Sequence, residues 1–286
     1  MVFCAPCQPF SSQNRKREPD KRARLLLEAG RFARVLRPKC ILLENVPGLT
    51  SPTNELIIRA LARRLKREGY TLSVPRSLDA ADTGVPQRRV RCVMIAARSR
   101  EAVEIFQSAV LQAKRRTVRD AIEGLKALAS GEADPDDHLH RARAHKTIAL
   151  QRLQAIPIDG GSRSDLPIHL RLKCHTDNHS FPDVYGRMLW DEVAPTLTTG
   201  CDDVTRGRFA HPNQDRAITL REAALLQTFP PDYLFSGSRS DIARQIGNAV
   251  PVAMVEAIAP ILKEVIRRSD NSATDTVGKR SRTTRH

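Results

Sequence analysis

Short apolar runs punctuate the first hundred residues. Each is four to nine residues long and is bounded by proline, glycine or charged residues, which is typical of buried strands. The four runs are Met1–Cys4, Lys39–Val46, Tyr70–Val74 and Arg89–Ala97. They are apolar almost throughout rather than alternating, which favours strands covered on both faces, as in parallel sheets.

Amphipathic stretches separate these runs. Between residues 19 and 35, apolar side chains recur at helical spacing, and Arg37-Pro38 ends the pattern. A second helix is predicted over residues 53–68, with Ser51 or Thr53 as its cap and Gly69 as its stop. Strands alternating with helices predict an α/β fold, with a parallel sheet and helices on both faces.

The pattern changes after residue 98. The stretch 99–187 is polar, basic and irregular, and we expect it to form a second, smaller domain inserted into the first, catalytic α/β domain (residues 1–98). Residues 188–268 return to the first domain, through a helix over 219–228 with a Thr219–Glu222 capping box and a last helix over 249–268. Residues 269–286 lack apolar side chains and are expected to be a disordered basic tail.

The charge of the chain points to a polyanionic partner. Its 286 residues carry a formal net charge of +15 at pH 7, which suits nucleic acid or another anionic surface. No apolar run approaches the length of a membrane-spanning helix, and no signal peptide is evident. The 6 cysteines show no secreted-framework spacing, so a reduced, cytoplasmic protein is expected.

Cys7 lies in a stiff local sequence, Ala5-Pro6-Cys7-Gln8-Pro9, at the end of the first apolar run. Prolines on both sides restrict the backbone there, and open α/β sheets place their reactive groups at strand ends. A buried structural cysteine is one alternative. Another is a redox pair or half a zinc site with Cys4, although no second Cys-x-x-Cys follows.

The histidines of the inserted region do not suggest a metal site. Their spacing is irregular, so we expect solvated or phosphate-facing side chains and no bound metal. They are His138, His140, His145, His169, His175 and His179.

Four further blocks follow the Pro-Cys-Gln at a distance. They are Glu44-Asn45-Val46, Gln87-Arg88-Arg89-Val90-Arg91, residues 221–230 and Gln245-Ile246-Gly247-Asn248-Ala249-Val250-Pro251. In this order and at these spacings the five blocks resemble the DNA cytosine-5 methyltransferases. The resemblance covers residue 2 to about residue 265, and the fold it implies is the Rossmann-like sheet of S-adenosylmethionine-dependent methyltransferases with an inserted target-recognition domain.

The resemblance implies a set of catalytic residues. Cys7 would be the thiolate that adds to carbon 6 of cytosine, and Glu44 would stabilise ring nitrogen 3. Arg91, with Arg89 beside it on the same strand face, would hold the exocyclic oxygen. Gln87, Arg221 and Gln227 are expected to organise structure rather than to take part in chemistry.

It also implies binding residues and partners. Double-stranded DNA would be the substrate, with the target base flipped out of the helix, and Pro6, Gln8, Ser11 and Asn45 would contact the DNA or the base. Asn248 and Val250 match positions that line the S-adenosylmethionine pocket. The expected setting is a bacterial restriction-modification system, with a nucleoid-associated protein that is monomeric if full-length.

One departure from the family concerns the cofactor. Members carry a strand and a Phe-x-Gly-x-Gly-type loop before the Pro-Cys-Gln, whereas no Gly-x-Gly occurs anywhere in this sequence. We therefore expect an N-terminally truncated sheet, an exposed edge on the cysteine-bearing strand, and weak or absent binding of S-adenosylmethionine. The explanations that remain are a start codon assigned too late, a separate N-terminal methyltransferase fragment, and a non-catalytic DNA-binding remnant.

Overall fold

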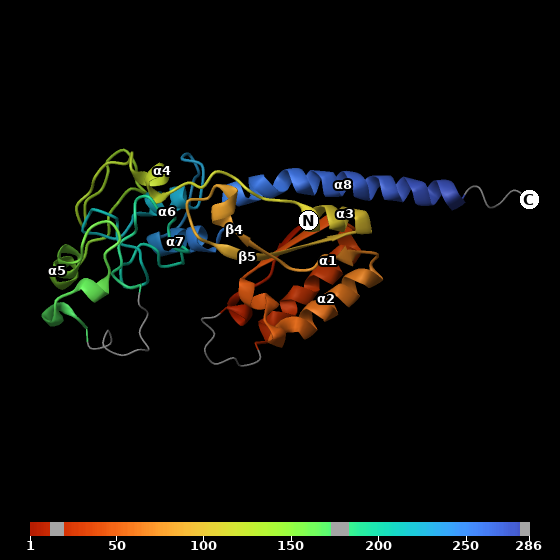
Figure 1. Cartoon of the computed structure of the whole chain (residues 1–286), viewed down its shortest axis with the longest axis horizontal. Helices are drawn as coiled ribbons and strands as arrows, with labels where there is room; N and C mark the ends of the chain where they lie inside the picture. The colour runs from red at the N-terminus through yellow and green to blue at the C-terminus, as the bar shows by residue number, and fades with distance from the viewer. Residues whose placement is uncertain (12–19, 173–182, 281–286) are drawn as a thin grey trace, which may run out of the picture. The chain divides into compact units, whose positions relative to one another are not determined.

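The computed structural model describes residues 1–11, 20–172 and 183–280, with side chains as far as Ser269. The chain divides into two compact units, which are treated separately (Figure 1). The first contains residues 1–79, 90–111 and 256 onward, and the second contains residues 80–89 and 112–255. These divisions differ from the expected return to the first domain at residue 188.

The first unit is built on a five-stranded sheet. Its order is β1 (Val2–Cys4), β2 (Cys40–Asn45), β5 (Val90–Ala97) and β3 (Thr71–Leu72), with β4 (Arg76–Asp79) also paired to β5. Within the described part of this sheet, β1 and β2 pair in parallel, whereas β5 pairs antiparallel with β2, β3 and β4. The prediction of a parallel sheet is wrong for β5, because β2 and β5 are both covered on two faces and a continuous apolar run carries no information about strand direction.

Two helices cover one face of this sheet. A 3₁₀ helix (Lys21–Leu27) runs into α1 (Glu28–Leu36), and α2 (Glu55–Arg67) packs beside them. Leu43 of β2 and Met94 of β5 are register partners and pack in the same apolar cluster as these helices. Side chains alternate along a strand, so Glu44 and its partner Val93 point to the opposite face.

Helix α3 (Arg100–Ser108) packs on β5, and Figure 1 shows it across the sheet from α1 and α2, with α8 beside it. Helix α8 spans Val252–Arg280. It therefore continues past Ser269, where a disordered tail was expected, because no proline interrupts it after Pro260. Residues 281–286 lie outside the described part.

The helix ends of the first unit follow the sequence signals only in part. Arg37 adopts a left-handed φ of 45° and closes α1 before Pro38, and Gly69 at φ 82° follows α2, both as expected. The expected caps of α2 are wrong. Its N-cap is Asn54, without a side-chain cap, and a short 3₁₀ helix (Pro52–Asn54) precedes it, so Ser51 and Thr53 fall outside the helix.

The second unit consists mainly of short helices joined by long loops. They are α4 (Val118–Ile122), α5 (Thr147–Ala155), α6 (Leu220–Leu226) and α7 (Arg239–Asn248). The predicted Thr219–Glu222 capping box of α6 is confirmed. Helices α4, α6 and α7 share one apolar cluster that includes Ile122, Leu226 and Ile246. Among the described residues of both units, no helix is both long and apolar enough to cross a membrane.

Candidate active site

Glu44 and Arg91 come together on the sheet of the first unit. Glu44 lies near the end of β2, and Arg91 near the start of the antiparallel β5, two residues before Val93, the register partner of Glu44. Glu44 and Arg91 are therefore diagonal neighbours across the two strands, and both side chains lie on one face of the sheet. Arg91 Nε lies 2.9 Å from Glu44 Oε1, and the two side chains are 11% and 15% exposed. The structure thus joins two residues that are far apart in the sequence.

Cys7 belongs to the same electrostatic group. Burial lowers the pKa of Arg91, and electrostatic interactions with Glu44 and Cys7 act in the opposite direction. Coulombic interactions of this kind fall off steeply with distance. Cys7 and the Arg91 guanidinium therefore interact electrostatically.

A second cysteine contacts Glu44. Cys4 is the parallel register partner of Glu44, so the two side chains share a face. Burial raises the pKa of the Cys4 thiol to about 11, and the charge of Glu44 and a hydrogen bond to it add to the effect. Cys4 therefore remains a neutral donor to the Glu44 carboxylate near pH 7. The described residues contain no cluster of three or more metal-ligating side chains.

The loop that carries Cys7 is held by the block around Glu44. Asn45 is buried, its amide nitrogen donates to the Ala5 carbonyl over 3.0 Å, and its oxygen accepts from the Val46 amide over 2.9 Å. Gly48 allows a close approach, since a Cβ there would lie 1.9 Å from the Phe10 carbonyl oxygen. Asn45, expected to contact the DNA or the base, holds the loop in place, and the role of Gly48 was not predicted from the sequence.

The other loop residues expected to contact DNA differ in exposure. Cys7 precedes a single 3₁₀ turn, Gln8–Phe10, whose Phe10 is buried and anchors the loop to the apolar cluster of the first unit. Gln8 is exposed, while Pro6, Cys7 and Ser11 are half-buried. Phe10 therefore anchors the loop, and Gln8 is exposed to solvent.

Arg89 does not join Arg91. The strand β5 begins at Val90, so the alternation that was expected to align the two arginines does not hold at Arg89. Arg89 is 3% exposed and belongs to the second unit, where it donates to the carbonyls of Leu197 and Gly247 over 3.0 and 2.8 Å. These bonds are structural, which leaves Arg91 as the arginine of the candidate site.

The predicted structural role of Gln87 is confirmed. Its side chain is fully buried, donates to Gln227 Oε1 over 3.1 Å and accepts from the Leu197 amide over 3.0 Å. Gln227 in turn donates to the Ile246 carbonyl over 2.6 Å. Helix α7 also lies close to the backbone at Thr198, because a Cβ at Gly247 would lie 2.4 Å from the Thr198 carbonyl carbon. Three of the five sequence blocks thus interlock inside the second unit.

Arg221 is also structural. Its guanidinium forms an ion pair with Asp137 and donates to the Pro231 carbonyl over 2.7 Å. These bonds join α6 to two loops of the second unit.

Asn248 and Val250 fit a cofactor only in part. Asn248 ends α7 and is exposed, and Val250 is half-buried two residues later. An amide and an apolar side chain are suitable for an adenosyl group. A cleft of this unit, of about 580 Å³, is lined by neither. Its lining residues are Arg143, Thr199, Gly200, Asp202, Asp203, Arg206, Ser238, Arg239, Ser240 and Ala243.

The second unit is organised by a buried polar network. Glu222 accepts from Arg216 over 2.7 and 2.8 Å, and both side chains are at most 1% exposed. Burial lowers the pKa of His211 to about 4, despite the Glu222 carboxylate 3.6 Å away. His211 is therefore neutral near pH 7.

The expectation of solvated histidines holds for His138 and His169, which are exposed. It is wrong for His140, which is buried between the Thr219 hydroxyl at 3.0 Å and the Lys126 carbonyl at 2.8 Å. His145 accepts from the Ala217 amide over 3.0 Å. His175 and His179 lie outside the described residues.

Comparison with known proteins matches nearly the whole chain. A protein-family model described as C-5 cytosine-specific DNA methylase matches residues 1–264. The type II methylase M.HgiDII of Herpetosiphon aurantiacus is 40% identical over 272 residues, which is 93% of this chain and 76% of that protein. The type II methyltransferase M.Eco47II of Escherichia coli is 31% identical over 273 residues, but this chain covers only 64% of its length.

A solved structure shares the fold. It is a candidate DNA modification methyltransferase encoded within an E. coli prophage, with a TM-score of 0.66 and 22% sequence identity. The match covers 93% of this chain and 78% of that one.

Proposed function

Because this chain belongs to the C-5 cytosine-specific DNA methylase family, we propose that it transfers a methyl group to carbon 5 of cytosine in double-stranded DNA. The observation that carries the proposal is the Glu44–Arg91 ion pair on one face of the sheet, with Cys7 within electrostatic range. These are the three side chains that the chemistry requires.

The proposed reaction begins at the Cys7 sulfur. A thiolate adds to carbon 6 of cytosine, and the electron pair of the 5,6 double bond moves toward carbon 5, which becomes nucleophilic. After carbon 5 has gained the methyl group, its proton leaves, the double bond re-forms and the Cys7–carbon 6 bond breaks. The cysteine is thus regenerated and acts as a covalent catalyst.

Glu44 and Arg91 stabilise the charge that develops on the ring. Glu44, protonated or sharing a proton with ring nitrogen 3 of the bound cytosine, forms a hydrogen bond that disperses negative charge during the attack. Arg91 fixes the Glu44 side chain through the 2.9 Å contact and presents its remaining donors to the exocyclic oxygen. Cys4 donates to Glu44 from the neighbouring strand and restricts it further.

Cytosine can reach this group only outside the base stack. The carboxylate and guanidinium are nearly buried, so a base inside a duplex would remain too far from the Cys7 sulfur. Base flipping of the target nucleotide follows, with Pro6, Gln8 and Ser11 of the loop against the DNA. The second unit, which includes most of the expected recognition domain, would read the target sequence through its loops.

S-Adenosylmethionine would supply the methyl group, with Asn248 and Val250 among its contacts. We propose that cofactor binding also needs a separate N-terminal segment whose strand pairs with β1. Two observations support this. Within the described residues β1 pairs with β2 alone, and Val2 on it is 65% exposed. An exposed strand edge is a template for pairing with another chain.

The setting we propose is a type II restriction-modification system, in which a cytoplasmic, nucleoid-associated methylase protects DNA. Both relatives named above are type II enzymes by name, and the net charge of +15 suits binding to DNA.

Methyl transfer from labelled S-adenosylmethionine to duplex DNA tests the proposal. We expect transfer by the chain when a family N-terminal segment is supplied, and none by Cys7→Ser with the same segment. Transfer that persists in Cys7→Ser would contradict the mechanism. DNA binding without transfer, under every combination of segments, would favour a non-catalytic DNA-binding remnant.

A further inference from the structure

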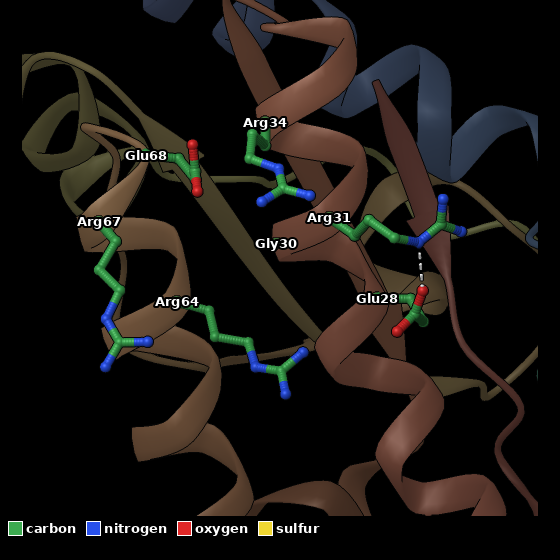
Figure 2. A pocket seen from close by; sticks show the side chains of 7 residues that line it. All are labelled: Glu28, Gly30, Arg31, Arg34, Arg64, Arg67 and Glu68. Atoms are coloured by element: carbon green, nitrogen blue, oxygen red, sulfur yellow. Dashed lines mark hydrogen bonds and ion pairs between the residues drawn. The ribbon is translucent and has the colours of Figure 1, made fainter.

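A groove on the first unit gathers arginines that the proposed reaction does not use. It lies between α1 and α2, has a volume of about 290 Å³, and is shown in Figure 2. Its lining residues are Glu28, Gly30, Arg31, Arg34, Arg64, Arg67 and Glu68. The four guanidinium groups exceed the two carboxylates, so the groove carries a net positive charge.

The arginines come in two pairs, one on each helix. Arg31 and Arg34 are one turn apart on α1, and Arg64 and Arg67 are one turn apart on α2, so each pair shares a helix face. Like charges at this spacing repel each other, and each pair is unfavourable without an anion. All four side chains are exposed.

Few of these charges are neutralised within the chain. Arg31 turns to Glu28, with 2.6 Å between Nε and Oε2. Arg64 reaches the Leu27 carbonyl only at 3.4 Å. Over the described residues, Arg34 and Arg67 have no ion-pair partner. Gly30 leaves room for this arrangement, since a Cβ there would touch the Arg64 Cβ at 3.0 Å.

The groove is separate from the candidate active site. Helices α1 and α2 cover the sheet face of Leu43 and Met94, whereas Glu44 points to the other face. An anion in the groove therefore does not compete with cytosine at Glu44.

We propose that this groove binds phosphate groups of DNA beyond the target site. Guanidinium groups match phosphate geometry, and side chains one helical turn apart can engage neighbouring phosphates of one strand. The formal net charge of +15 favours a polyanion over a small anion as the source of these phosphates. The inference extends the proposed function, because it supposes that the chain binds duplex DNA.

The test compares two double variants of equal charge. Arg34→Ala/Arg67→Ala removes two groove arginines, and Arg59→Ala/Arg100→Ala removes two exposed helix arginines that pair with Glu55 and Glu104 outside the groove. Circular dichroism checks that both variants fold. Binding is measured by fluorescence anisotropy against salt concentration, without cofactor, on duplexes of about one and about four helical turns.

We expect the groove variant to bind the long duplex about tenfold more weakly, with a salt slope shallower by about 2. The short duplex and the control variant should change by less than about twofold. Equal effects of both variants on the long duplex would overturn the proposal.

Two further binding measurements, with pyrophosphate and with anionic lipid vesicles, distinguish other sources of phosphate. Pyrophosphate or anionic lipid vesicles that bind the wild type but not the groove variant, with DNA binding unchanged, would also overturn it. A failure of methyl transfer alone would count against the proposed function and leave this result intact, because the binding assay needs no turnover.

Discussion

Replacing Gly48 by alanine should displace the loop that carries Cys7. The Cβ of the new side chain would lie 1.9 Å from the Phe10 carbonyl oxygen and 3.1 Å from its carbonyl carbon. Phe10 cannot easily yield, because its ring is 4% exposed and its amide donates to the Cys7 carbonyl over 2.9 Å. Movement of Phe10 is therefore transmitted to Cys7.

The size of the effect follows from these distances. Carbon and oxygen atoms rest at about 3.3 Å or more, so the contact must lengthen by more than about 1 Å. Overpacking of this kind costs about 1–3 kcal/mol of stability. A displacement of about 1 Å at a reacting atom can lower a rate about 100-fold. We expect both losses, with the loss of rate dominant.

The assay follows exchange of the cytosine carbon 5 hydrogen with solvent in duplex DNA. Addition of Cys7 to carbon 6 permits this exchange without S-adenosylmethionine, since carbon 5 then takes up and loses a proton. Gly124→Ala is the matched control, because an added Cβ there has no atom within 4 Å. Exchange at the wild-type rate in Gly48→Ala, with a normal melting temperature, would refute this account of the loop.

Three further results are expected. Asn45→Ala should lower the free energy of unfolding by about 1–3 kcal/mol in urea titrations, because it leaves the buried Ala5 carbonyl and Val46 amide without their partner. An unchanged midpoint and slope of the unfolding curve would refute this role of Asn45. Arg91→Met should lower the free energy of unfolding by about 3 kcal/mol, because it leaves the nearly buried Glu44 carboxylate without its ion-pair partner. In a double-mutant cycle, Glu44→Gln/Arg91→Met should recover much of this loss, whereas strictly additive effects would argue against a coupled pair. Burial lowers the folded-state pKa of His211 from 6.5 to about 4, so between these pH values the unfolded chain binds more protons than the folded chain. The neutral His211 should therefore contribute about 3 kcal/mol to the free energy of unfolding above pH 6.5, and this contribution should disappear toward pH 4. His211→Gln should flatten the dependence of unfolding free energy on pH in that window, and an identical slope in both proteins would disprove the assignment.

The sequence blocks located the candidate site but not its geometry. The resemblance of the five blocks to the DNA cytosine-5 methyltransferases implied Cys7, Glu44 and Arg91 as site residues. The pairing of Glu44 with Arg91 depends on β2 and β5 being antiparallel, and two continuously apolar strands do not reveal their direction.

Arg89 shows a second limit of sequence reasoning. Its expected alignment with Arg91 assumed a strand that starts one residue earlier than β5 does. Its actual partners, the carbonyls of Leu197 and Gly247, are more than a hundred positions away, and local pattern gives no access to such contacts. His140 was misjudged for the same reason, since burial between Thr219 and Lys126 is a tertiary property.

The sequence indicates only weakly the roles of the structural residues around Cys7. Gly48 follows a proline at a strand end, which is a common turn sequence and says nothing of a 1.9 Å approach. Cys4 attracted notice through its Cys-x-x-Cys spacing, yet its contact is with Glu44, its partner on the parallel strand.

The most direct test of the central claim is carbon 5 hydrogen exchange on duplex DNA by the wild-type chain and by Cys7→Ser, without S-adenosylmethionine. Exchange needs the thiolate, Glu44 and Arg91, and it needs no methyl donor. The account predicts exchange with the wild type and none with Cys7→Ser. Equal exchange by the two proteins, or none by a wild-type chain that binds the DNA, would contradict it.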